Sequence, residues 1–287
     1  MIPYFIISKI MNRFGSKAMF HQPIDKLFYN SKVVKPRYKY PCQIQQSFSI
    51  ENHTIITHHY NIKKKKVIFY FPGGAFIDPP SMFHYKFAKK IAYKTKRRVI
   101  MFQYPLFPEV DPITTTLLIK RIIKKYNYND VVLMGDSAGA NLALYVLCSF
   151  QKENKDFIKK VILISPWIDG KLENNQIDVI KQYDFVLDKQ NCIEIAKNVY
   201  GKYLDSSIYL CPTLNDFKFK TEVLMFSGEH EIFTPDAIKW SKQQNVLNVK
   251  HYVYKKMCHC FAILPIDNQR KVLKKISNFL LKWYWLI

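Results

Sequence analysis

A serine flanked by two glycines is the residue best suited to chemistry in this 287-residue chain. The apolar run 131–134 leads directly into Gly135-Asp-Ser137-Ala-Gly139, and a helical pattern follows at 138–151. A strand that turns sharply into a helix needs glycines on both sides of the turn, and it leaves the serine hydroxyl exposed at the strand end. This setting predicts Ser137 as the nucleophile of an acyl transfer.

A pair of glycines, Gly73-Gly74, follows the apolar run 67–71. A turn without side chains at this place allows backbone amides to point at the oxyanion that develops when a carbonyl is attacked. A loop with this role belongs after the strand that precedes the serine unit.

A carboxylate and a histidine follow later in the chain. The run 223–227 ends at Gly228 and is followed by Glu229, Glu231 and Asp236, any one of which can orient an imidazole. His259 follows a short strand-like run at 252–255. The chain order of serine, acid and histidine is that of α/β hydrolases.

The elements that must position these residues alternate between strand and helix along the chain, which indicates an α/β fold. We expect a mostly parallel sheet of eight strands with helices on both faces, because most of the runs are apolar on both sides. The expected strands are 48–50, 54–58, 67–71, 98–103, 130–134, 160–164, 222–227 and 252–255, and the expected helices are 83–95, 111–126, 138–151, 235–244 and 267–283.

The length fits one domain over residues 1–287. Two segments, 1–44 and 170–218, add no strand and are longer than ordinary connections. Long inserts in compact domains are often lids or binding loops, so both are predicted to form a cap.

Several motifs together resemble the α/β-hydrolase esterases and lipases of the hormone-sensitive-lipase-like branch. The resemblance extends over about residues 65–265 and rests on Tyr70-Phe-Pro-Gly-Gly-Ala-Phe76, Tyr104-Pro-Leu-Phe-Pro-Glu109, Gly135-Asp-Ser-Ala-Gly139, Ser165-Pro-Trp-Ile-Asp169, Gly228-Glu-His-Glu-Ile-Phe233 and Met257-Cys-His-Cys-Phe261. The chain departs from the family where Pro72 replaces a histidine, Ala75 replaces a third glycine and Glu231 replaces an aspartate.

The resemblance implies a Ser-His-Glu triad. Ser137 is the expected nucleophile, His259 the general base and then acid, and Glu231 the carboxylate that orients the imidazole, whereas Asp236 is expected to begin the next helix. The backbone amides expected to bind the oxyanion are those of Gly73, Gly74 and Ala138.

The resemblance implies hydrolysis of small carboxylic esters with a short acyl chain, with no metal or organic cofactor. Two alternatives remain open: an amide or formamide hydrolase similar to kynurenine formamidase, and a catalytically weak ligand-binding protein on the same scaffold. A metal site at Cys258-His259-Cys260 is disfavoured because adjacent residues cannot close a tetrahedral zinc site.

The formal charge of +22 permits attraction to polyanions, but no nucleic-acid motif accompanies it. Peripheral contact with an anionic membrane is a further interpretation, whereas no run is long enough to span a bilayer. Six scattered cysteines and the lack of an export signal indicate a cytoplasmic protein with reduced thiols. The histidines at 53, 58 and 59 are expected to be exposed polar positions.

Overall fold

The computed structural model describes residues 42–126, 128, 130–201 and 217–281. Within these ranges, eight strands form one sheet in the order β1-β2-β4-β3-β5-β6-β7-β8. The pairs β1/β2 and β2/β4 are antiparallel, and all neighbours from β4 to β8 are parallel. The predicted α/β fold with a mostly parallel eight-stranded sheet is therefore confirmed.

The strands follow the apolar runs of the sequence. They are β1 Ile44–Ile50, β2 His53–Tyr60, β3 Val67–Phe71, β4 Arg98–Gln103, β5 Val131–Asp136, β6 Ile158–Ile164, β7 Thr221–Gly228 and β8 Leu247–Tyr254. Every residue of β3 and β5 is buried, which explains why these strands are apolar at nearly every position. The predicted start of β8 at residue 252 is wrong, because β8 is an edge strand and its exposed Asn248 and Lys250 interrupt the apolar pattern.

The helices lie between the strands as expected. They are α4 Met82–Lys94, α5 Pro112–Lys125, α6 Ala138–Lys152, α7 Gln176–Ile180, α8 Lys189–Tyr200, α10 Thr234–Gln243 and α11 Asp267–Leu281, with the short 3₁₀ helix η3 at Phe261–Ile263. Local chemistry fixes the start of α5: the Asp111 carboxylate accepts the amides of Ile113 and Thr114 at 2.8 and 3.0 Å, and Pro112 occupies the first helical position.

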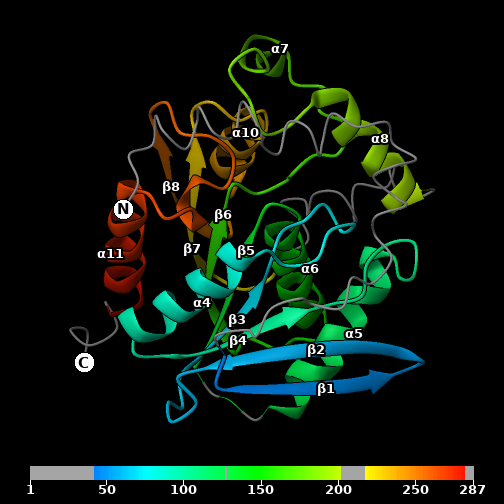
Figure 1. Cartoon of the computed structure of the whole chain (residues 1–287), viewed down its shortest axis with the longest axis vertical. Coiled ribbons are helices and arrows are strands. Elements are labelled where there is room, and N and C mark those ends of the chain that lie inside the picture. Colours follow the sequence, from blue (N-terminus) through cyan, green and yellow to red (C-terminus); the bar gives the residue numbers. More distant parts are fainter. Residues whose placement is uncertain (1–41, 127, 129, 202–216, 282–287) are drawn as a thin grey trace.

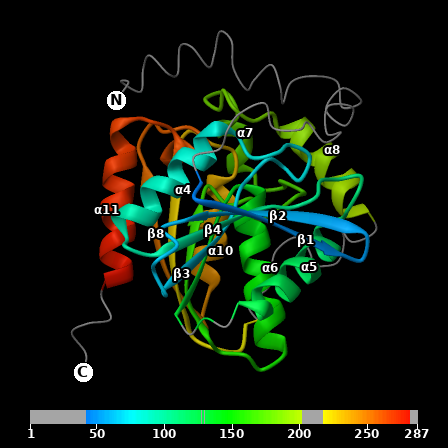
Figure 2. The ribbon, with the colours of Figure 1, turned by 60° about the horizontal axis from the view of Figure 1, so that its bottom comes forward.

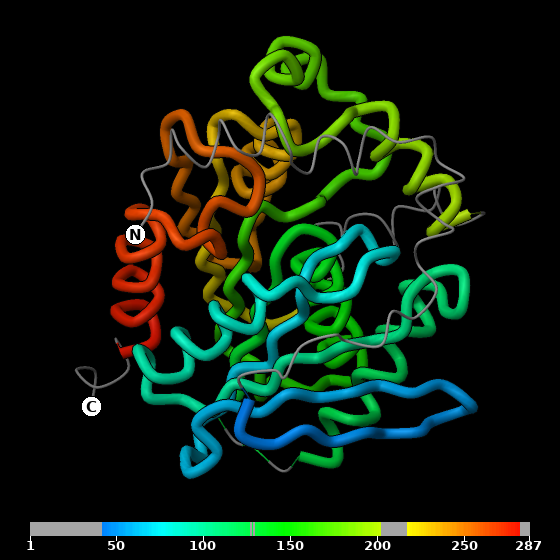
Figure 3. Tube along the Cα trace, viewed as in Figure 1, coloured from blue at the N-terminus to red at the C-terminus, as the bar shows by residue number. Residues whose placement is uncertain are grey.

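Helices cover both faces of the sheet (Figure 2). Helices α4 and α11 contact each other on one face, and α5 and α6 pack together on the other. Helix α6 contacts β3, β5 and β6, so the helix that follows Ser137 lies against the middle of the sheet. The β1–β2 hairpin and the β8 strand lie at opposite edges of the sheet (Figure 3).

Two of the three histidines expected on the surface are buried. His58 and His59 have no exposed area, because Tyr85 of α4 packs on His58 and Tyr126 packs on His59, on opposite faces of the sheet. His58 Nε2 lies 3.1 Å from Gln103 Oε1, and His59 Nδ1 accepts a hydrogen bond from Arg98 at 2.6 Å. Burial, with the charge of Arg98 adding to it, lowers the pKa of His59 to about 4.

The segments predicted to form a cap are described only in part. Residues 1–41 and 202–216 lie outside the described ranges, and Ile44, at the end of the first segment, begins β1. Helices α7 and α8, which belong to the second segment, lie beyond the C-terminal ends of the strands (Figure 1). Among the described helices, none combines the length and the apolar character needed to cross a membrane.

Candidate active site

Ser137 lies on a tight turn between β5 and α6. Its backbone has φ 53° and ψ −123°, a conformation that a residue with a side chain rarely adopts. A Cβ on Gly135 would lie 2.1 Å from the carbonyl oxygen of Gly139, and a Cβ on Gly139 would lie 2.0 Å from that of Phe71. Both glycines are therefore required by the close approach of β3, β5 and α6.

His259 and Glu231 continue from Ser137 in a hydrogen-bonded row. Ser137 Oγ lies 3.0 Å from His259 Nε2, and His259 Nδ1 lies 2.9 Å from Glu231 Oε2. A carboxylate only accepts, so Nδ1 carries the ring proton and Nε2 is left to accept the serine proton. The three residues, which are 122 and 28 positions apart, thus meet at one end of the sheet.

The loops after β7 and β8 hold the acid and the histidine in place. Glu231 is fully buried, and its Oε1 accepts the Gly228 amide at 2.8 Å and the Thr234 hydroxyl at 3.2 Å. A Cβ on Gly228 would lie 2.2 Å from the carbonyl oxygen of Met257, so a glycine is needed where the two loops touch. Asp236, the other acidic candidate, lies in the first turn of α10.

The Gly73 amide does not fit its expected place in the oxyanion hole. It donates instead to Asp136 Oδ2 at 3.1 Å, so this amide is already engaged. The two glycines of the loop therefore differ: Gly74 has φ 129°, and neither its amide nor that of Ala75 donates to a group in the described part of the chain. Ala138 is the first residue of α6, where an amide has no partner within the helix.

Asp136 is the centre of a buried network beneath this loop. Its Oδ1 accepts the Tyr70 hydroxyl at 2.6 Å, and its Oδ2 lies 3.1 Å from His84 Nε2. His84 Nδ1 accepts the Ser81 amide at 2.9 Å, so the ring proton is on Nε2 and is donated to Asp136. Burial raises the pKa of Asp136, but the effects of His84, Tyr70 and Gly73 outweigh it and lower that pKa overall.

The segment after β4 fixes the other side of the loop. The Tyr104 hydroxyl donates to the Pro72 carbonyl at 2.5 Å, and the Phe107 amide donates to the Phe76 carbonyl at 2.8 Å. Pro72, which replaces the histidine of the family motif, therefore lies in a loop whose backbone is held from β4.

Cys260 also lies at this site, close to His259 and Asp136, which the sequence analysis did not predict. Its Sγ lies 3.4 Å from His259 Nε2 and 3.7 Å from Asp136 Oδ2, and its amide donates to Ser165 Oγ at 3.0 Å. Burial and then the charge of Asp136 raise the pKa of this thiol well above its usual range. Its position immediately after His259 in the sequence is the signal that could have predicted this contact.

Asp184, in the inserted segment, is a second overlooked residue. It is buried and lies in the connection between α7 and α8, and its Oδ2 accepts the amide of Ile232, the neighbour of Glu231, at 2.9 Å. Burial raises the pKa of Asp184 to about 6, although three amide hydrogen bonds oppose this shift. No local motif marks this contact.

Aromatic rings surround the histidine side of the site. The Phe233 ring meets His259 edge-on at 5.2 Å between centroids, and the Trp167 ring stacks on Phe233 at 5.5 Å. Tyr200 of α8 lies edge-on to both Trp167 and Phe76, at 6.5 and 6.0 Å. A row of aromatic side chains thus extends from the loop after β7 to the loop after β3.

Comparison with known proteins shows which families and structures this chain is similar to. A family model described as the α/β hydrolase fold matches residues 68–263. An esterase of Acinetobacter venetianus is 26% identical over 199 residues, which are 64% of this chain and 63% of the esterase. A triacylglycerol lipase of Mycobacterium tuberculosis is 36% identical over 102 residues, 34% of this chain and 23% of the lipase. The chain thus matches less than two thirds of the length of either relative.

A solved structure shows the same architecture. The crystal structure of an esterase from the bacterial hormone-sensitive lipase family superposes with a TM-score of 0.74 at 20% identity, over 90% of this chain and 97% of that one. The fold that the resemblance implies is therefore confirmed. Because the family model extends from β3 to η3, and so includes Ser137, Glu231 and His259, the chain belongs to the α/β hydrolase fold family.

Proposed function

We propose that the protein is a serine hydrolase of carboxylic esters with Ser137, His259 and Glu231 as its triad. The observation that supports this most directly is the unbroken row of hydrogen bonds from Ser137 Oγ through the imidazole to the buried Glu231 carboxylate. The names of the matched relatives, an esterase and a triacylglycerol lipase, agree with an ester substrate.

The reaction proceeds by acyl transfer to water. His259 Nε2 takes the Ser137 proton as Oγ attacks the ester carbonyl, and the imidazolium then gives that proton to the leaving alcohol. Water attacks the acyl-enzyme in the second half, again with His259 as base and then acid. Glu231 keeps the imidazole in the tautomer that both steps need and stabilises its charged form.

The oxyanion is stabilised by backbone amides. Gly74, Ala75 and Ala138 supply them in this proposal, because the Gly73 amide donates to Asp136. Removing one such donor typically costs about 10²–10³-fold in rate, so the orientation of this loop contributes to the rate in addition to the triad.

The aromatic row favours small substrates with a short acyl chain. Phe76, Trp167 and Tyr200 belong to the loop after β3, the loop after β6 and the end of α8, and their rings contact each other in sequence. Trp167 stacks on Phe233, which meets His259 edge-on, so this row of rings reaches the histidine. Rigid rings there limit the width available to an acyl chain, and they suit a compact acyl group.

Hydrolysis of p-nitrophenyl acetate, butyrate, octanoate and palmitate tests the proposal. We expect the rate to fall with chain length, and Ser137→Ala to lose at least about 10³-fold in kcat. Ser149→Ala, at the far end of α6, is the matched control and should keep full activity. Activity that persists in a folded Ser137→Ala variant would refute the mechanism.

Two further outcomes identify the alternatives. Hydrolysis of formanilide faster than of any ester would favour a formamide hydrolase with the same triad. A folded protein that hydrolyses neither class, yet binds an ester analogue, would favour a ligand-binding protein.

A further inference from the structure

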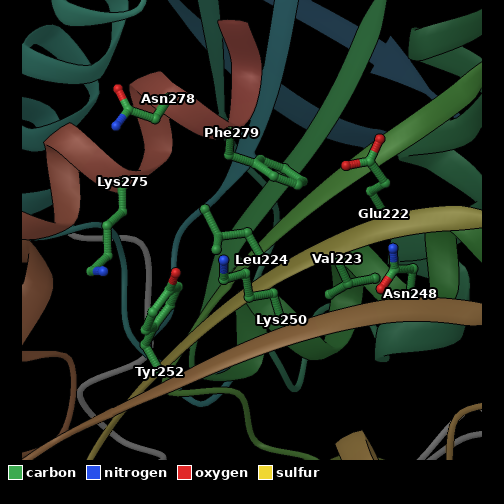
Figure 4. A pocket seen from close by; sticks show the side chains of 9 residues that line it. All are labelled: Glu222, Val223, Leu224, Asn248, Lys250, Tyr252, Lys275, Asn278 and Phe279. Carbon is green, nitrogen blue, oxygen red and sulfur yellow. The ribbon is translucent and has the colours of Figure 1, made fainter. Parts of the chain in front are cut away.

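A cavity lies on the side of the sheet that α11 covers. It has a volume of about 350 Å³, opens to the surface, and is lined by the first half of β7, by residues 248–252 of β8 and by the last two turns of α11 (Figure 4). Small-molecule sites typically begin at about 300 Å³. The cavity is therefore large enough for one small organic molecule.

The cavity is separate from the candidate active site. Its wall on β7 begins at Glu222, whereas the loop that holds Glu231 follows Gly228 at the other end of the same strand. Leu224, the last β7 residue of that wall, lies four residues before Gly228, about 13 Å along the strand, and Tyr252 pairs with Phe226, two residues before it. A ligand in this cavity does not touch Ser137 or His259.

Two ammonium groups converge on one phenol in the cavity. Lys275 Nζ lies 3.8 Å from the centroid of the Tyr252 ring, and Lys250 Nζ lies 5.5 Å from it. The hydrogen bond from Lys250 and the charge of Lys275 lower the pKa of the phenol. Within the described ranges, neither lysine has a carboxylate within ion-pair distance, so the positive charge at this end of the cavity is not neutralised.

The rest of the cavity combines apolar side chains, two amides and the Glu222 carboxylate, and Lys160 Nζ lies 4.8 Å from the centroid of the Phe279 ring. Leu224 and Phe279 lie between the lysine end and Glu222, which stands at the opposite side (Figure 4). Asn248 and Asn278 add neutral hydrogen-bonding groups. Glu222 would repel a second anionic group, so the cavity suits a ligand with its negative charge at one end only.

We propose that this cavity binds a small organic anion, with its carboxylate or phosphate among Lys250, Lys275 and the Tyr252 hydroxyl and its apolar part on Leu224 and Phe279. The two ammonium groups and the hydroxyl supply donors for charge-assisted hydrogen bonds. The side chains of Leu224 and Phe279 supply apolar contact that an inorganic ion does not use.

Titration of the full chain with four probes tests this site by calorimetry. Benzoate and phenyl phosphate carry the two candidate head groups on the same ring, benzamide lacks the charge, and inorganic phosphate lacks the ring. We expect the better of the two aromatic anions to bind at least about tenfold more tightly than benzamide and inorganic phosphate, and their order identifies the preferred head group.

Paired lysine variants locate the binding. The double variant Lys250→Gln/Lys275→Gln should bind the aromatic anion at least about tenfold more weakly than the parent, while its ester hydrolysis is unchanged. Lys63→Gln with Lys64→Gln removes the same charge from an exposed turn and should leave the affinity unchanged. Phe279→Leu should weaken phenyl phosphate but not inorganic phosphate.

Three results would overturn the proposal. The first is a double variant Lys250→Gln/Lys275→Gln that binds the aromatic anion as tightly as the parent. The second is an equal loss of affinity in the double variant Lys63→Gln/Lys64→Gln. The third is no binding up to about 10 mM, a concentration at which even a site with a millimolar Kd would fill. Binding of benzoate at the active site would instead inhibit hydrolysis competitively and persist in the Lys250/Lys275 pair. The outcome is therefore independent of whether the chain is an esterase.

Discussion

The carboxylate of Asp184 joins the inserted segment to the loop that carries Glu231. Its Oδ2 accepts the Ile232 amide at 2.9 Å, while its Oδ1 accepts the amides of Val186 and Leu187 at 2.9 and 3.0 Å. One buried side chain therefore fixes both a turn of the insert and the backbone next to the proposed catalytic acid.

Asp184→Asn should impair catalysis without touching the triad. An asparagine has one acceptor oxygen, so either the turn or the Ile232 amide loses its partner, at a cost of about 1–3 kcal/mol. We expect kcat to fall about 5- to 10-fold with little change in KM, because the position of Glu231 relative to His259 changes. Asp178→Asn, exposed on α7, is the control. An unaltered kcat in folded Asp184→Asn would show that Glu231 is positioned without the insert.

Substitution of Asp136 tests the support of the oxyanion loop. Asparagine can keep an oxygen toward Gly73 and His84, whereas alanine leaves three buried donors without an acceptor, including the Tyr70 hydroxyl. We therefore expect Asp136→Asn to lower kcat by less than about 10-fold and Asp136→Ala by about 100-fold or more. Circular dichroism and thermal unfolding check that both variants fold.

The comparison between these two variants decides the interpretation. Equal losses of kcat would mean that the charge of Asp136, rather than its hydrogen bond to Gly73, is what the site needs. No loss in either variant would mean that the loop is held by other contacts, such as that of Tyr104 with the Pro72 carbonyl.

Cys260 should make the enzyme sensitive to thiol reagents. A methylthio group added to its sulfur by methyl methanethiosulfonate would occupy space beside His259 Nε2, which is 3.4 Å away. The raised pKa of the thiol predicts slow inactivation near pH 7 that accelerates as the pH rises, since only the thiolate reacts.

Cys260→Ser should keep most of the activity and resist the reagent. Cys258→Ser is the matched control, because Cys258 is only two residues away, and this variant should be inactivated like the parent. Inactivation of Cys260→Ser at the parental rate would show that another cysteine is responsible.

The parts of the site that follow from the sequence are those fixed by local backbone geometry. The turn at Ser137 needs Gly135 and Gly139 within a few residues, and so the motif is visible in the chain. Glu231 and His259 lie in the loops that follow β7 and β8. These two strands are neighbours in the sheet, so the strand order brings the two residues together.

What the sequence does not reveal depends on tertiary contacts. The direction of the Gly73 amide depends on Asp136, which belongs to a different strand. The link from Asp184 to Ile232 joins residues 48 positions apart with no motif in either segment. His58 and His59 look like surface positions in the sequence, but Tyr85 and Tyr126, from distant parts of the chain, pack on them in the fold.

Two histidines, the buried His59 and the partly buried His251, should make the fold sensitive to acid. The pKa of His59 and that of His251 are each lowered to about 4, chiefly by burial, against a usual value of about 6.5. Between these values the unfolded chain binds more protons than the folded one, so these histidines reduce the free energy of unfolding as the pH falls. Burial of their carboxyl groups raises the pKa values of three other residues to about 6, and these act in the opposite direction over the same range: Asp78, Asp184 and Asp236.

A difference between variants separates these opposing effects. The free energy of unfolding of the parent minus that of His59→Gln should decrease by up to about 3 kcal/mol between pH 7 and pH 4, because only the parent has this histidine to protonate. Urea denaturation at several pH values measures it, and His53→Gln, on the same strand but partly exposed, should change far less. A difference that stays constant with pH would mean that His59 is protonated in the fold as readily as in the unfolded chain, despite its position beside Arg98.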